Sequence, residues 1–122
     1  MPRRAFLFLV LLAAACSGAR SLYVDRQQGL DGAWAVEGTR MDASGDTVTV
    51  RFQGRTFVFP GLKSCRGMVA AEEVHLNGEG IGVDLTLEDA RFQGPGGVVE
   101  RKMADLPTDK EIVFAFGGLL YR

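Results

Sequence analysis

Residues 46–59 alternate between polar and apolar side chains, and this two-residue period restricts the segment to β-strands. The dipeptide Gln53-Gly54 interrupts the alternation midway and has the length of a two-residue hairpin turn. A turn at this place puts apolar residues opposite one another on one face of the sheet. The expected cross-strand pairs are Val48–Phe59 and Val50–Phe57. We therefore predict a β-hairpin with one buried face.

A second alternating segment surrounds Asn77-Gly78-Glu79-Gly80, with apolar residues in step from Val74 to Leu87. Asn-Gly tolerates positive φ at both positions, which is typical of hairpin turns. A two-residue loop and a four-residue loop both keep the apolar faces together, so the register stays open. Further strands are predicted at residues 22–24, 33–38, 98–103, 111–116 and 119–121. Residues 63–73 are the best candidate for one or two helical turns, although Gly67 weakens a helix there.

The whole pattern predicts an all-β fold, a small antiparallel barrel or sandwich of six to eight strands. The 16 glycines suit many tight turns between short strands. The chain has 122 residues, of which 47% are hydrophobic. This is enough for one modest core and not for two.

The N-terminus carries a different pattern, in which Arg3 and Arg4 precede an apolar run from Ala5 to Ala15. This run is about half of the roughly 20 residues that a membrane-spanning helix needs. It has the character of a cleavable secretory signal. We expect residues 1–15 to be the signal peptide, residues 16–29 a lipidated cysteine with a tether, and residues 30–122 the β domain.

The segment Ala13-Ala14-Ala15-Cys16 resembles the lipobox of bacterial lipoproteins. That motif usually has Leu three positions before the cysteine, where this chain has Ala13. The resemblance implies that Cys16 carries lipid such as palmitate, and two or more acyl chains hold a protein stably on a membrane. Ser17 implies the periplasmic face of the outer membrane in a Gram-negative host. The alternative is cleavage after Ala19, which releases a soluble periplasmic or secreted protein.

Charge and cysteine content limit the partners. The formal net charge is −1, and no basic stripe gives nucleic-acid binding an electrostatic footing. If Cys16 carries lipid, Cys65 has no partner in the chain and is a buried apolar residue or an exposed thiol. If Cys16 keeps its thiol, Cys16 and Cys65 can form a disulfide in an oxidising envelope.

The segment Gly32-Ala33-Trp34 opens the first full strand and resembles the lipocalin and wider calycin barrels. In that family the Trp closes one end of the barrel, and a late Arg packs across its ring. The resemblance implies a structural clasp between Trp34 and Arg122, worth about 0.5–2 kcal/mol. The part after the signal is short for a lipocalin, so a reduced or open barrel is expected.

The chain is also similar, more weakly, to the META-domain envelope proteins. The matching positions are Trp34, Phe52, Gly61 and Cys65, with later echoes at Lys102-Met103-Ala104 and Glu111. The Gly-Cys-Asn signature of that family is absent, because this chain reads Ser64-Cys65-Arg66. The second cysteine of the family is also missing.

Few residues here carry chemistry. His75 is the only histidine; it shares a strand face with Glu73, and Glu79 could lie nearby across the turn. A metal site needs three or four convergent ligands, so none is expected. A Cys65–His75 nucleophile pair lacks an orienting group and an oxyanion donor, and residues 42–46 lack the full ligand set of a calcium loop. There is no phosphate loop or dinucleotide fingerprint either, so we expect a non-catalytic protein without a cofactor. An enzyme that uses His75 and its acidic neighbours is a third hypothesis, under which His75→Ala abolishes the activity.

These features predict an exported, lipid-anchored envelope protein that acts as a non-catalytic binding module. Its ligand is a small apolar molecule, a peptide or an envelope component. Carriage inside the fold predicts a cavity lined by Phe57, Phe59, Val83 and Leu85. The alternative is an inhibitor of a secreted or periplasmic hydrolase, which predicts a rigid protruding loop at Asn77–Gly80 or Gly94–Gly97.

Overall fold

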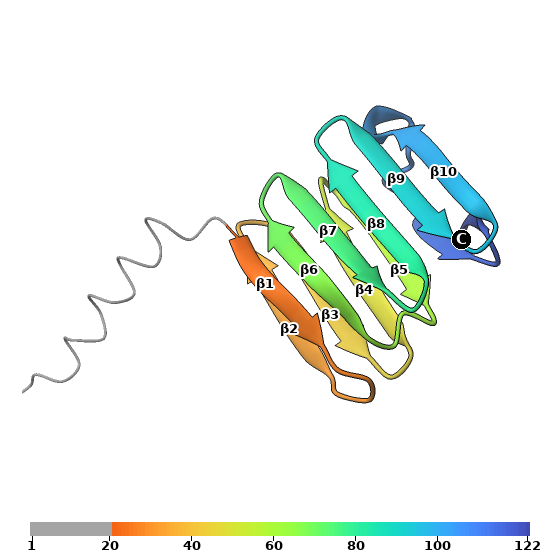
Figure 1. Ribbon diagram of the computed structural model, residues 1–122. Coiled ribbons are helices and arrows are strands. Elements are labelled where there is room, and N and C mark those ends of the chain that lie inside the picture. The colour runs from red at the N-terminus through yellow and green to blue at the C-terminus, as the bar shows by residue number, and fades with distance from the viewer. Residues whose placement is uncertain (1–20) are drawn as a thin grey trace, which may run out of the picture.

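The computed structural model describes residues 21–122 and folds them into two stacked β-sheets (Figure 1). In spatial order, sheet A comprises β1 (Ser21–Arg26), β6 (Cys65–Ala70), β7 (Glu73–Gly78), β8 (Ile81–Thr86), β9 (Asp89–Gly94) and β10 (Gly97–Lys102). Sheet B comprises β12 (Gly118–Tyr121), β11 (Glu111–Ala115), β5 (Arg55–Pro60), β4 (Thr47–Phe52), β3 (Thr39–Ser44) and β2 (Gly32–Val36). A short 3-10 helix, η1 (Met103–Asp105), lies between β10 and β11 along the chain.

Two meanders build the sheets, because β2 to β5 are consecutive neighbours in sheet B and β6 to β10 are consecutive neighbours in sheet A. Strand β1 pairs with β6, and the chain then crosses to sheet B at β2. After η1 the chain crosses again, and β11 pairs with β5. Among the described strands this β5–β11 pair is the parallel one, and the others are antiparallel.

The inward faces of the strands fill the space between the sheets. Phe92 has its ring centroid 6.1 Å from those of both Phe57 and Phe59, and 5.4 Å from that of Phe114. These four side chains come from both sheets and are 0–3% exposed. Burying a side chain of this kind contributes about 1.5–3 kcal/mol, so this aromatic cluster holds the two sheets together.

Both predicted hairpins are present. In β4–β5, Val48 pairs with Phe59 and Val50 with Phe57, which is the predicted register. In β7–β8, Gly78 pairs with Ile81, so the loop is the two-residue Glu79-Gly80 and the open register is settled. Glu79 and Gly80 both have positive φ, while Asn77 remains in the strand.

The predicted all-β fold is confirmed in its sandwich form, since the two sheets stay separate instead of closing into one barrel. The described residues form twelve strands, more than the six to eight expected. The segments that form β3, β6 and β9 were not predicted as strands. The expectation of helical turns at residues 63–73 was wrong. The segment contains β6, in which Cys65 and Val69 are buried and Gly67 lies against the backbone of His75.

The β domain starts by Ser21 instead of at residue 30, because β1 is an integral strand of sheet A. Val24 is 0% exposed and Arg26 is 2% exposed. The predicted signal peptide and the predicted lipid site at Cys16 lie outside the described residues. Within residues 21–122 the structure contains no helix with the length and apolar character needed to cross a bilayer.

Candidate functional site

Four of the hairpins close with the same kind of turn, a residue at positive φ followed by glycine at positive φ. The four turns are Glu37-Gly38, Gln53-Gly54, Glu79-Gly80 and Phe116-Gly117. Three of them present a polar side chain to water, as a turn in solvent requires. The fourth presents Phe116, which is 103% exposed at φ 53°. Positive φ is uncommon for a bulky residue, so the chain combines strain with a fully solvated aromatic ring at this one position.

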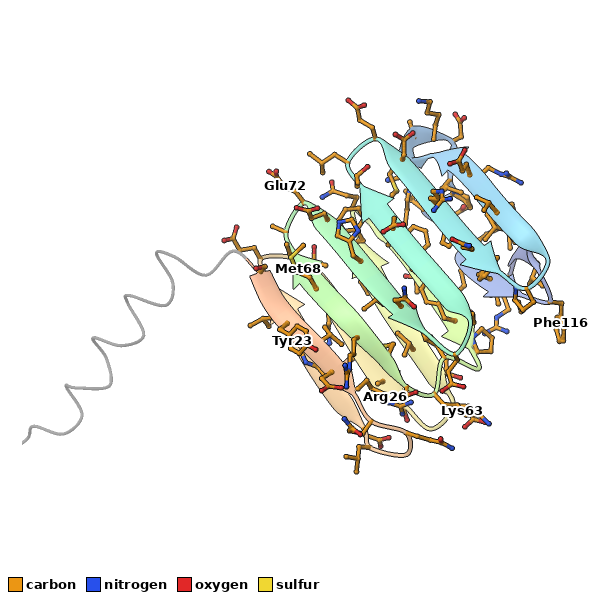
Figure 2. The ribbon with its side chains drawn as sticks, viewed as in Figure 1. Tyr23, Arg26, Lys63, Met68, Glu72 and Phe116 are labelled. Atoms are coloured by element: carbon orange, nitrogen blue, oxygen red, sulfur yellow. The ribbon has the colours of Figure 1, made fainter. Side chains whose placement is uncertain are left out.

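An apolar groove lies beside Phe116, between the ends of the two sheets. Its volume is about 440 Å³. The lining side chains belong to Pro60, Ile81, Pro95, Phe114, Ala115 and Phe116, and Gly96 and Gly117 complete the wall. None of these residues is charged. We call Phe116 with this groove the Phe116 site; Figure 2 shows the Phe116 ring pointing away from the sandwich, on the far side of the molecule from Tyr23 in β1.

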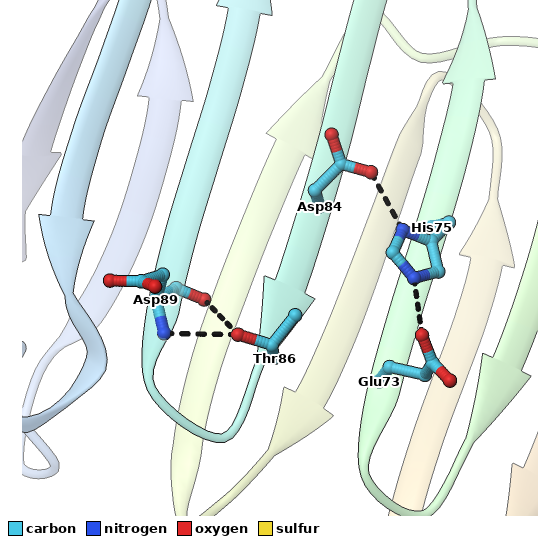
Figure 3. Close-up of polar contacts among 5 residues, drawn as sticks. All are labelled: Glu73, His75, Asp84, Thr86 and Asp89. Atoms are coloured by element: carbon cyan, nitrogen blue, oxygen red, sulfur yellow. Dashed lines mark hydrogen bonds and ion pairs between the residues drawn. The ribbon is translucent and has the colours of Figure 1, made fainter.

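The outer face of sheet A carries a second arrangement, a row of paired charges that runs across the strands. His75 pairs with Asp84, Asp84 with Arg91, and Arg91 with Glu100, each directly opposite the next. The imidazole lies between two carboxylates, with Nδ1 2.6 Å from Asp84 Oδ1 and Nε2 2.7 Å from Glu73 Oε1 (Figure 3). Arg91 Nε lies 3.2 Å from Glu100 Oε2.

The geometry around His75 favours the imidazolium. A neutral imidazole has one N–H and one lone pair, so it can donate to only one of its two carboxylates. The hydrogen bond with Asp84, followed by that with Glu73, raises the pKa of His75 above its ordinary value, against partial burial that lowers it. In the imidazolium form both nitrogens donate, one to each carboxylate. The row is therefore a chain of paired charges across β7, β8, β9 and β10.

A proton titration should show this directly, because the chain has a single histidine and gives one imidazole resonance in NMR. We expect the midpoint of His75 to lie above that of an unstructured histidine. Asp84→Asn should lower it, since the largest stabilising contact is lost. The raised pKa adds stability that is fully present below the unfolded value near 6.5 and is lost as the pH rises through the folded pKa.

Glu100→Gln is the matched control for that titration, because Glu100 belongs to the same row but does not contact His75. In Glu100→Gln the titration midpoint of His75 should stay at the wild-type value. Two results would contradict a pKa of His75 raised by its carboxylate partners. One is a wild-type midpoint equal to that of an unstructured histidine, and the other is the same midpoint in Asp84→Asn and the wild type.

The predicted ligand-lining residues do not line a cavity. Phe57, Phe59, Val83 and Leu85 are 0–1% exposed and pack within the core cluster. The alternation that pointed them inward was correct, and Phe92 from sheet A and Phe114 from sheet B pack in the same space. All four predicted residues are therefore part of the packed core.

The predicted clasp between Trp34 and Arg122 does not form. Trp34 lies on β2 and Arg122 follows β12, and these strands are the two opposite edges of sheet B. Trp34 instead packs over Gly32, where a Cβ would lie 2.8 Å from the indole Cη2. Arg122 pairs with Glu111, with 2.8 Å between Nε and Oε1.

Cys65 and His75 lie on opposite faces of sheet A, so they form no nucleophile pair. Within residues 21–122, Cys65 is a buried free thiol, and burial raises its pKa to about 11. Glu79, which was expected near His75, instead accepts a hydrogen bond from the Ser64 hydroxyl at 2.7 Å. In the described part of the chain no three His, Cys, Asp or Glu side chains gather as a metal site.

Sequence reasoning missed Phe116 and Asp84. The signal for Phe116 was present, because Phe116-Gly117 repeats the residue-glycine pattern of Gln53-Gly54. Asp84 follows from the β7–β8 register once the loop has two residues, which places it opposite His75. Comparison with protein-family models, curated proteins and solved structures found no match, so the function is inferred from the residues alone.

Proposed function

We propose that this chain is an exported envelope protein, anchored by lipid on Cys16, whose β-sandwich is a non-catalytic binding module. The observation that carries the proposal is the full exposure of Phe116 on a turn whose three counterparts are polar. A buried phenylalanine contributes about 1.5–3 kcal/mol, and the free protein forgoes this at Phe116. A partner that covers the ring recovers it, as aromatic anchors do at protein interfaces.

The rest of the molecule supports binding at the surface. Phe57, Phe59, Val83 and Leu85 are buried in the core cluster, so they are not open to a ligand at the surface. His75 is held between Glu73 and Asp84, so both of its ring nitrogens already have protein partners. The Phe116 site offers what a binding surface requires, an exposed aromatic ring beside an uncharged groove.

The position of the anchor suits this use. Cys16 precedes Ser21 by five residues, a reach of about 17 Å at full extension. Strand β1 and the Phe116 turn lie on opposite sides of the molecule (Figures 1 and 2). A lipid at Cys16 therefore holds the β1 side at the membrane, proposed to be the periplasmic face of the outer membrane, and turns Phe116 away from it. A protein released by cleavage after Ala19 would present the same site in the periplasm or outside the cell.

Photo-crosslinking in the native host tests this function. The photoreactive analogue benzoyl-phenylalanine replaces Phe116 in the full chain, and light should then produce one adduct of defined mass in the membrane fraction. The same analogue at Gln53 is the control, because Gln53 also has positive φ before a glycine and is also exposed. It should give no such adduct.

The anchor is tested in the same cells by Cys16→Ser, which should move the chain from the membrane fraction to the soluble fraction. Equal adducts from positions 116 and 53, or none from either, would refute a specific partner at Phe116. Membrane association that survives Cys16→Ser would refute the lipid anchor.

Inhibition of a secreted hydrolase is the second candidate. The loops predicted for inhibition, Asn77–Gly80 and Gly94–Gly97, are tight turns. The second loop packs beside the Phe116 turn, because a Cβ on Gly96 would lie 3.7 Å from the Cα of Gly117. The Phe116 turn is the feature that favours inhibition, because a rigid hairpin with one exposed aromatic side chain suits an apolar enzyme subsite. A hydrolase as the crosslinked partner would select this candidate.

A further inference from the structure

The free edge of sheet B lies directly beside the Phe116 site. Glu111 and Arg122 exchange two backbone hydrogen bonds, of 2.7 and 3.0 Å. Hydrogen-bonded pairs alternate along an antiparallel ladder, so Gly118 and Leu120 also face β11. The backbone N–H and C=O groups of Leu119 and Tyr121 therefore point out of the sheet, and no described strand lies on that side of β12.

Charge distinguishes this edge from the neighbouring edge of sheet A. Strand β10 ends in Glu100, Arg101 and Lys102, and charged residues of this kind discourage the pairing of a further strand. Strand β12 reads Gly-Leu-Leu-Tyr, with no charge and no proline. Leu120 and Tyr121 are 43% and 44% exposed, so the edge is apolar as well as unpaired.

The groove continues this edge along the chain. Ala115, Phe116 and Gly117 line the groove, and the next residue, Gly118, begins β12. A strand lying along Leu119 and Tyr121 would pass the Phe116 ring and reach the groove. Since the groove wall has no charged residue, it accepts an apolar side chain and disfavours a charged one.

We propose that the partner contributes an extended, uncharged segment that adds to sheet B as a strand beside β12. The backbone groups of Leu119 and Tyr121 bond to this segment, and one of its apolar side chains fills the groove against Phe116. Main-chain bonds then supply affinity and the groove supplies selectivity, as in other cases of strand addition. This inference rests on the proposed function, because it names the partner of the Phe116 site.

The remainder of the chain does not supply this segment. The tether between Cys16 and Ser21 enters at β1, which lies against β2 at the opposite edge of sheet B. Five strand spacings of about 4.8 Å separate β2 from β12, about 24 Å in all. With residues 1–15 removed, as the proposed function has it, the tether spans about 17 Å when fully extended, which is too short to reach β12.

Peptide selection with the full chain tests the proposal. Octapeptides displayed on phage are selected against the purified full chain, and the recovered sequences are made as fluorescent probes. They should be uncharged, with apolar residues at alternate positions. Tyr121→Pro should weaken their binding about tenfold, because it removes an outward N–H at an edge position where proline is compatible with a sheet. Bound peptide should also slow hydrogen exchange at the Leu119 and Tyr121 amides.

Tyr121→Thr separates the two contributions of this residue, since it removes the ring and keeps the N–H, and it should weaken binding less than Tyr121→Pro does. If Phe116→Gln weakens binding and Tyr121→Pro does not, the Phe116 site stands and strand addition is overturned. If neither variant weakens binding, both proposals fail. Selection of charged peptides, a dimer that Tyr121→Pro dissolves, or stronger binding to phospholipid vesicles than to the probes would each overturn the proposed occupant.

Discussion

Replacing Arg26 with methionine should lower the free energy of unfolding by about 3 kcal/mol, one of the two largest effects expected for a single substitution in this chain. Arg26 is 2% exposed, and its guanidinium reaches three loops. Nε donates to the Leu30 carbonyl at 3.0 Å, Nη2 to that of Gly45 at 2.7 Å, and Nη1 to that of Lys63. Without the guanidinium these part-buried carbonyls lose their donor, and the three loops lose the side chain that joins them.

Thermal or urea unfolding measures this effect. At about 4–8 °C per kcal/mol, the melting temperature should fall by at least about 12 °C. Arg66→Met is the control, because the Arg66 side chain is 73% exposed and should contribute within about 0.5 kcal/mol. Equal stability of the two variants would show that Arg26 does not hold the loops together.

Gly67→Ala should destabilise the fold by about 3 kcal/mol or more, through steric overlap within the backbone. A Cβ on Gly67 would lie 1.7 Å from the carbonyl oxygen of His75 and 2.7 Å from its carbonyl carbon. Neither atom can move without separating β6 from β7, which are adjacent strands at the centre of sheet A. The loss is measured as a shift of the urea midpoint.

Gly82→Ala is the matched control for that substitution. Gly82 lies in the same sheet, and its Cβ would meet only Gln93 Cβ, at an ordinary contact distance of 3.7 Å. We expect a change within about 0.5 kcal/mol. A Gly67→Ala variant as stable as Gly82→Ala would mean that the two strands are farther apart than the structure has them.

The sequence revealed the fold where alternation was uninterrupted. In β4 and β5 the residues Val48, Val50, Phe52, Phe57 and Phe59 point inward and Gln53-Gly54 is the turn, so class, register and buried face were all predictable. Strand β6 was hidden because Gly67 and Met68 break its alternation, and Gly67 is required by a close approach that only the folded chain contains. Strand β3 was hidden because Asp42 and Ser44 are typical of loops.

The candidate site was less predictable for a related reason. Phe116 ends an alternating run, so its period placed it on a strand face, whereas the turn places it in water. Arg26 belongs to a polar segment and carries no signal of burial, because its three partners are backbone carbonyls of distant loops. The filled interior depends on how two sheets stack, and a single alternating pattern specifies only one side of that contact.

The parallel pairing of β11 with β5 has a consequence for biogenesis. The strand that pairs with β5 is synthesised after all of sheet A, so Phe114 reaches the aromatic cluster last. Until residues 111–121 have been made, β5 remains an open edge and the Phe116 hairpin does not exist. A nascent chain that stops before residue 111 thus lacks the proposed binding surface, which forms together with the last part of sheet B.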